Sequence, residues 1–110
     1  MSFPRKIVNA AKRSLAHEKC AGKRLLKTGG RYYDPIYWSS RIAATGCALE
    51  TQRAMSEWAR GEQRSSKLPP ERSQSAVLVA WLEQQICETG EELAGFRNDL
   101  NRALSLGREG

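Results

Sequence analysis

Very few residues in this chain combine the side chains and the spacing that enzymatic chemistry requires. His17 is the single histidine, and Cys20 follows it about one helical turn later. A catalytic thiol and its base also need a third group that orients them in a pocket, and a helix surface this basic offers no obvious pocket. The adjacent carboxylates Glu91 and Glu92 point in different directions on a helix, so they do not form an acid–base pair. The sequence therefore predicts that the protein is not an enzyme.

Metal and cofactor sites are not predicted either. Cys20, Cys47 and Cys87 are widely spaced and lack the Cys-x-x-Cys pattern of zinc sites and the arrangement of a disulfide framework. We interpret them as buried, reduced thiols of a cytoplasmic protein. The pair Gly29-Gly30 lacks the spacing of a phosphate-binding loop and indicates a linker. We expect no metal ion and no cofactor.

The strongest functional signal is the positive charge near the N-terminus. The 110-residue chain has a net charge of +6, and residues 1–31 hold nine Lys or Arg with one acid. Residues 32–110 hold nine Lys or Arg with eleven acids. A basic arm on a nearly neutral body favours a polyanionic partner, nucleic acid first and an anionic membrane surface second. The alternative is a solvated polar face that keeps a small protein soluble.

Helical periodicity places these cations on one side of a helix. At 100° per residue, one arc holds the apolar residues Phe3, Ile7, Val8, Ala11, Leu15, Ala21, Leu25 and Leu26. The predicted phosphate-binding residues are Arg5, Lys6, Lys12, Arg13, Lys19, Lys23, Arg24 and Lys27 on the opposite arc, followed by Arg31 and Tyr32. Such contacts do not distinguish DNA from RNA. Glu18 interrupts the apolar arc, which makes a membrane partner less favoured, and Gly22 leaves a helix break open.

Residues 31–41 interleave four aromatic side chains with two arginines. Exposed rings of this kind could stack on unpaired bases, each stack being worth ~1–3 kcal/mol. Buried rings would instead join the arm to the rest of the protein, and a small core must use its largest side chains. We favour the buried interpretation, with Tyr32 as the ring left outside.

The remaining sequence predicts a long helical hairpin. Only 11 residues are β-branched, which argues against a sheet, and no apolar run is long enough to span a bilayer. Asp34 and Pro35 give a helix start, with Tyr33 stapled onto Trp38 and Gly61 as the terminating residue. The small residues 43–48 indicate either a close helix contact or a turn at Gly46.

A polar loop over residues 61–70 precedes the last helix. From there, a 4–3 spacing forms an apolar seam of Val79, Leu82, Ile86, Thr89, Leu93, Phe96, Leu100 and Ala103. The seam stays in phase across Gly90, which favours one long helix. We expect the N-terminal helix to cover part of this seam, and self-association or a partner protein to cover the rest.

The segment 52–62 resembles the recognition-helix end of lambda-repressor-type helix-turn-helix domains. It contains Met55-Ser56-Glu57-Trp58 followed by a glycine, and residues 44–47 are similar to the turn of that motif. The spacing from Gly46 to Trp58 is longer than in the pattern by three residues, and bulky Ile42 stands where the motif has a small residue. The resemblance implies that Gln52, Arg53 and Ser56 face base edges in the major groove. The alternative is an ordinary amphipathic helix with Leu49, Met55 and Trp58 in the core.

The sequence predicts an all-α protein with a basic N-terminal amphipathic helix and a long antiparallel, coiled-coil-like helical hairpin. We divide it into an arm of residues 1–31 and a hairpin domain of residues 32–110, with helices at about 35–60 and 70–106. The predicted function is non-enzymatic nucleic-acid binding through phosphate contacts, in an accessory or regulatory role. The alternative is a protein–protein interaction module that docks through the seam, with Leu93, Phe96, Leu100 and Leu104 as its interface.

Overall fold

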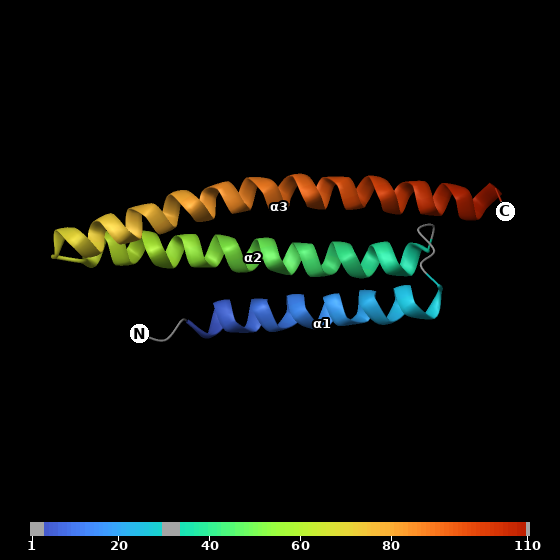
Figure 1. Ribbon diagram of the computed structural model, residues 1–110, viewed down its shortest axis with the longest axis horizontal. Helices are drawn as coiled ribbons and strands as arrows, with labels where there is room; N and C mark the ends of the chain where they lie inside the picture. The colour runs from blue at the N-terminus through green and yellow to red at the C-terminus, as the bar shows by residue number, and fades with distance from the viewer. Residues whose placement is uncertain (1–3, 30–33, 110) are drawn as a thin grey trace.

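In the computed structural model of the chain, the described residues are 4–29 and 34–109, without the side chains of residues 71 and 107–109. They form the helices α1 (Arg5–Lys27), α2 (Pro35–Ser65) and α3 (Pro69–Glu109), with no strand among them (Figure 1). The prediction of an all-α fold is confirmed. All three helices run through the glycines of their interiors, including Gly22, Gly46 and Gly90.

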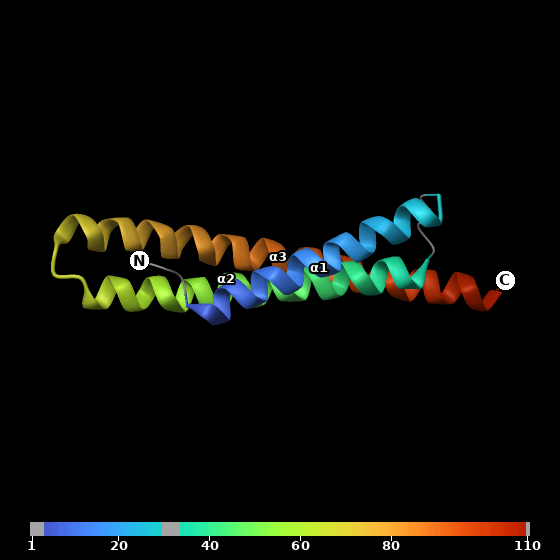
Figure 2. The same ribbon diagram turned by 90° about the horizontal axis from the view of Figure 1, so that it is seen from below.

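The helix α2 lies in the middle of an elongated layer. The helices α1 and α3 pack along opposite edges of α2, and in the described residues they do not pack against each other. Both run antiparallel to α2, so they point the same way along the 62 Å axis of the molecule (Figure 1). The layer is twisted, because α1 and α3 cross α2 at an angle (Figure 2). The expectation that α1 covers the seam of α3 is therefore wrong, because α1 uses α2 instead.

The start of α2 agrees with the sequence prediction, whereas its end does not. The Asp34 carboxylate accepts a hydrogen bond from the Ile36 backbone N–H at 3.3 Å, with Pro35 in the first turn. The helix passes through Gly61 and ends at Ser65, so residues 66–68 alone connect α2 to α3. A glycine inside a helix costs only about 1 kcal/mol, which packing against α3 offsets. The predicted staple of Tyr33 on Trp38 lies outside the described residues.

The interface between α2 and α3 is formed by the seam. Leu82 is 1% exposed and is the largest fully buried side chain among the described residues, and Thr89, Leu93 and Ala103 are also buried. The Phe96 ring packs against Trp38 of α2, with ring centroids 5.8 Å apart. The predicted seam is thus the surface by which α3 binds α2.

The interface between α1 and α2 is formed by small side chains. Ala10 and Ala21 of α1 are fully buried. Ser14 donates its hydroxyl to the backbone oxygen of Ala44 at 2.9 Å, which requires a close approach of the two helices. The stretch of small residues in α2 is therefore a helix contact and not a turn.

This close contact corrects the predicted orientation of α1. The apolar arc of the sequence analysis is only half used, because Ile7 is buried whereas Val8, Leu15 and Leu26 are exposed. Small residues face α2, since they allow the backbones to approach most closely. Much of the larger apolar surface of α1 therefore stays in contact with solvent.

The cysteines also differ from the expectation. Cys20 and Cys87 are exposed and Cys47 is half-buried, and all three are free thiols. None of the three is fully buried, so the interpretation of the cysteines as core residues is wrong. Among the described residues, no helix is both long and apolar enough to cross a membrane.

Candidate nucleic-acid interface

Five cations of α1 form one stripe on the side that faces away from α2. They are separated by four or seven residues, so they share a side of the helix, and each is exposed. We call this set the cationic stripe: Arg5, Lys12, Lys19, Lys23 and Lys27. The stripe extends over ~33 Å of helix. In the described part of the chain, none of its members forms an ion pair with a carboxylate.

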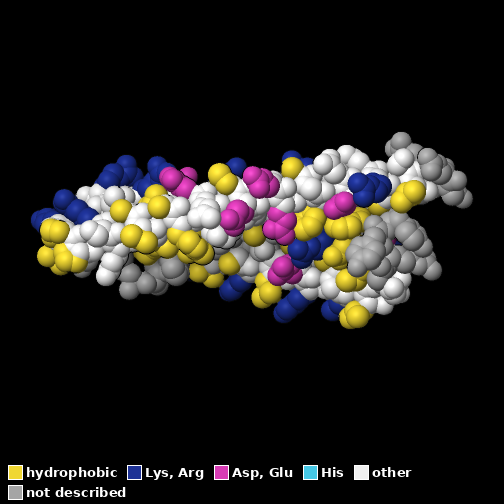
Figure 3. All heavy atoms as spheres, turned by 45° about the horizontal axis from the view of Figure 1, so that its top comes forward, with side chains coloured by type: hydrophobic (Ala, Val, Ile, Leu, Met, Phe, Trp, Pro, Cys, Tyr) yellow, Lys and Arg dark blue, Asp and Glu magenta, His cyan; other side chains and the backbone are white. Residues whose placement is uncertain are grey.

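The space-filling view shows where charge gathers on one face of the molecule. Lys and Arg side chains project along the lower edge, where α1 lies, and Asp and Glu side chains cluster in the middle, over α3 (Figure 3). Further Lys and Arg side chains lie at the end where α2 and α3 are connected (Figure 3). The described α1 carries eight Lys or Arg and one acid, whereas α3 carries four Arg and seven acids.

Two of the predicted phosphate-binding residues have structural partners instead. Arg24 forms an ion pair of 2.6 Å with Asp34 and donates a second hydrogen bond of 3.2 Å to the same carboxylate. Arg13 lies 3.1 Å from Glu50 of α2. Arg24 therefore attaches α1 to the start of α2, and Arg13 attaches it to the middle of α2. A phosphate would have to compete with the carboxylates of Asp34 and Glu50 for these two arginines.

The Arg24–Asp34 pair is the more enclosed of the two. The hydrogen bond from Arg24 lowers the pKa of Asp34, and the N–H of Ile36 acts in the same direction, against the opposing effect of burial. The same carboxylate raises the pKa of Arg24. Asp34 thus stays ionised, so it caps α2 and holds the end of α1 with one side chain.

The other predicted phosphate-binding residues lie beside the stripe or outside the description. Lys6 is exposed and lines a depression between α1 and α2 together with Glu50 and Glu57. A phosphate would have to compete with these two carboxylates for the Lys6 ammonium group. Arg31 and Tyr32 lie outside the described residues.

The base-reading residues implied by the helix-turn-helix resemblance are not arranged as that motif requires. The helix α2 is continuous through residues 44–47, so no turn precedes a recognition helix. Ser56 is buried at 6% exposure, and the Oε1 atom of Gln52 is also enclosed. Only Arg53 is exposed. The resemblance does not hold, and Leu49 is buried while Met55 and Trp58 are half-buried, as in an ordinary amphipathic helix.

The residues predicted to bind a protein partner lie mostly against α2. Leu93 is buried, and Phe96 and Leu100 are half-buried. Leu104 is 41% exposed. A partner protein could therefore cover Leu93, Phe96 and Leu100 only if α3 separated from α2.

The remaining candidates for chemistry are dispersed. His17 is half-buried and Cys20 is exposed. No group of three metal-ligating side chains occurs in residues 4–29 and 34–109.

Arg41 is the residue that the sequence analysis overlooked. Its guanidinium lies 3.4 Å from Glu18 of α1 and 3.9 Å from Glu92 of α3. It also stacks over the Phe96 ring, 5.0 Å from the centroid. Arg41 therefore connects all three helices, and it explains why Glu18 lies within the apolar arc of α1. The sequence signal was Glu18 itself, an acid on an apolar face that needs a cationic partner.

Comparison with known proteins adds no assignment: no family model, no curated protein and no solved structure matches this chain.

Proposed function

We propose that this protein is a non-enzymatic, nucleic-acid-binding accessory protein that holds the phosphate backbone along the cationic stripe of α1. A cytoplasmic location with reduced thiols belongs to the same proposal. The supporting observation is that the five stripe residues face away from α2 and lack carboxylate partners in the described structure.

The geometry of the stripe suits an extended polyanion. Duplex DNA presents one charge per ~1.7 Å of its axis, so a stripe of ~33 Å lies within reach of many phosphates. Arg13 and Arg24 keep α1 on α2 through Glu50 and Asp34, so the stripe is displayed on a supported helix. Contacts of this kind provide affinity without sequence preference.

The seam-docking alternative has less support. The seam residues of α3 pack against α2, so a partner would have to open the hairpin. Opening the hairpin costs free energy, whereas the cationic stripe of α1 is already exposed. We therefore favour the stripe over the seam as the binding surface.

The salt dependence of binding tests the proposal. We expect log Kd, measured by fluorescence anisotropy on a random duplex and a random RNA strand, to rise with log salt with a slope of about 3.5 to 4.5 if five phosphates are engaged. The triple variant Arg5→Gln, Lys23→Gln, Lys27→Gln should lower this slope by about 2 to 3. It leaves the ion-paired residues Arg13 and Arg24 intact.

The matched control removes the same charge elsewhere. The triple variant Arg53→Gln, Arg64→Gln, Arg102→Gln changes exposed cations of α2 and α3, and we expect its slope to stay within about one unit of the wild type. Equal losses in both triple variants would mean that net charge alone drives binding. Binding to vesicles of anionic lipid, with none to either nucleic acid, would replace this proposal by a membrane surface.

A further inference from the structure

One face of the helix layer carries three separate depressions between neighbouring helices. Because α1 and α3 pack on opposite edges of α2 without meeting, α2 borders all three. On α2, Arg41, Ala48 and Glu62 follow one another at multiples of seven residues, and each borders a depression between helices or contacts a neighbouring helix. We call this side of the layer the open face.

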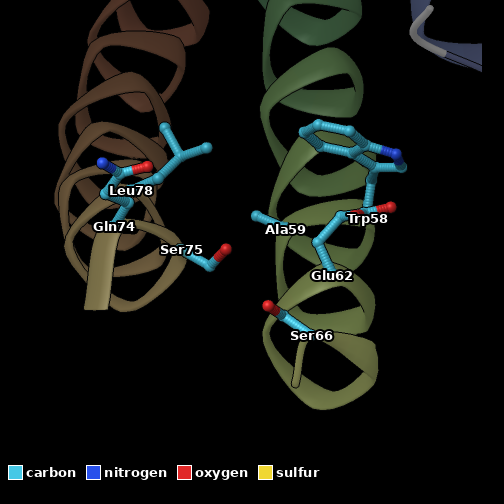
Figure 4. A pocket seen from close by; sticks show the side chains of 7 residues that line it. All are labelled: Trp58, Ala59, Glu62, Ser66, Gln74, Ser75 and Leu78. Carbon is cyan, nitrogen blue, oxygen red and sulfur yellow. The ribbon is translucent and has the colours of Figure 1, made fainter. Parts of the chain in front are cut away.

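The walls of the open face expose large apolar side chains. On α1, Leu15 borders two depressions of about 330 and 350 Å³ and is 53% exposed. On α3, Leu78 borders a third depression of about 300 Å³, where it faces Trp58 and Ala59 of α2 (Figure 4). Trp81 follows Leu78 by three residues and is 54% exposed, and helical spacing places the two side chains on the same side of α3.

The opposite face of the layer is covered by charge pairs. Glu50, Arg53, Glu57 and Arg60 follow one another at three or four residues, so they share that side of α2. Arg13 reaches Glu50 from α1, and Glu83 reaches Arg60 from α3. Charged side chains therefore line this opposite face, whereas Leu15 and Trp81 are exposed on the open face.

The two walls of the open face carry opposite charges. Lys12 and Lys19 of the cationic stripe border the α1 wall. Lys12 lies three residues, less than one turn, before Leu15, and Lys19 directly follows Glu18. On the α3 wall, Glu88 and Glu92 continue the row that contains Leu78 and Trp81 at intervals of three and four residues.

Arg41 fixes which residues of the two walls lie at the same level. It reaches both Glu18 and Glu92, and α1 and α3 run in the same direction (Figure 1). Equal numbers of residues therefore cover equal distances from these two points. Lys19 therefore lies level with Glu92 to within one residue, and Lys12 lies within one turn of the level of Glu88. Val8 lies level with Leu82, the residue next to Trp81.

We propose that the open face is covered by a second copy of this chain, with α1 of each copy lying over α3 of the other. A two-fold axis parallel to the helices keeps every residue at its level and exchanges the two walls. The lysines Lys12 and Lys19 then meet Glu88 and Glu92 of the other copy, and Val8 contacts the exposed ring of its Trp81. Both sets of pairs form twice.

Charge excludes the other face-to-face arrangement. A two-fold axis across the helices would place α1 on α1 and α3 on α3, which sets like charges against each other. The face is also large enough, since the layer measures 62 by 22 Å and a stable interface buries ~800 Å² on each partner. Arg5, Lys23 and Lys27 take no part in these pairs, so the dimer leaves three of the five cations of the stripe unpaired.

A charge exchange tests this arrangement without any nucleic acid. We expect light scattering over a concentration series to give the mass of a dimer for the wild type. Lys12→Glu and Glu88→Lys each place like charges together at two symmetric positions, and each should weaken dimerisation at least tenfold. The double variant restores opposite charges and should return the dissociation constant to within about threefold of the wild type.

The control is Arg53→Glu, which makes the same charge change on the ion-paired face and should leave the dimer intact. Circular dichroism of each variant verifies that its helix content is unchanged. A monomeric wild type, an assembly that grows without limit, or a double variant that stays as weak as the single variants would each overturn the proposal. These outcomes are independent of the triple variants that test nucleic-acid binding.

Discussion

The two helix interfaces of this protein are built on different principles. Between α2 and α3, large side chains such as Leu82, Leu93 and Phe96 interlock along the seam. Between α1 and α2, Ala10 and Ala21 permit close approach, and the larger apolar residues of α1 stay largely outside. Burial of a large apolar side chain contributes about 1.5–3 kcal/mol, so α3 is held mainly by apolar burial.

The interface of α1 depends more on polar contacts. On α2, the Ala44 backbone oxygen binds Ser14 and the Glu50 carboxylate binds Arg13. Asp34, which caps α2, binds Arg24. The Arg13–Glu50 pair is exposed, and exposed ion pairs contribute only about 0–1 kcal/mol. The comparison teaches that α1 is the less firmly attached helix, so it should separate from α2 before α3 does. That difference suits a helix whose outer side binds a ligand.

Leu82→Ala tests the apolar interface and should have the largest effect. Removing the largest fully buried side chain leaves a cavity, and we expect the free energy of unfolding to fall by about 2–5 kcal/mol. Urea unfolding followed by circular dichroism measures this change. Val77→Ala is the control, since Val77 is 71% exposed and its truncation should cost less than about 0.5 kcal/mol. Similar losses in both variants would contradict a seam-dominated α3 interface.

Ala10→Leu tests the close contact between α1 and α2. Ala10 is fully buried, so a larger side chain forces the helices apart at a cost of about 1–3 kcal/mol. Hydrogen exchange should accelerate in the amides of α1 and stay unchanged in α3. Ala16→Leu places the same side chain at an exposed position of α1 and should leave exchange unaltered. Faster exchange in α3 as well would mean that the two interfaces are not independent.

Substitution of Asp34 should have the smallest effect on the free energy of unfolding among these variants. It should also change most clearly how that free energy depends on pH. Asp34→Ala removes the cap of α2 and should cost about 1 kcal/mol, whereas Asp34→Asn keeps a capping oxygen and removes the charge that Arg24 binds. Because the pKa of Asp34 is lowered in the folded protein, its carboxylate stabilises the fold above its ordinary pKa of about 3.9.

That contribution is lost as the pH falls below about 4 and through the lowered pKa of the folded protein. Urea unfolding from pH 7 downward should therefore show the wild-type advantage over Asp34→Asn shrinking toward zero. A constant difference between the two proteins across this range would show that the Arg24–Asp34 pair does not stabilise the fold.

Local patterns in the sequence predicted most of the helical structure correctly. The cap at Asp34, the seam from Val79 to Ala103 and the continuous helix through Gly90 all appear in the structure. Each depends on residues close together in the chain, whose periodicity or capping chemistry is visible in sequence. The end of α2 was wrong because Gly61 weakens a helix only slightly, and contact with α3 decides whether the helix continues.

The candidate site could be predicted only in part. The cations of α1 were identified from their spacing, but the sequence did not separate the stripe residues from Arg13 and Arg24, which bind Glu50 and Asp34. The contribution of Arg41 was missed as well, since its partners Glu18 and Glu92 come from two other helices. Pairing between distant residues depends on how the helices are placed, which periodicity does not specify.

The sequence by itself determined that this chain forms helices, where one of them is capped, and which side of the last helix is apolar, because these properties arise within a few turns of backbone. Only the tertiary structure decided that α1 turns its small residues toward α2, since that choice depends on how closely two surfaces can approach. The same choice leaves Leu15 exposed on one flank and sends the cationic stripe outward, and both proposals rest on that orientation.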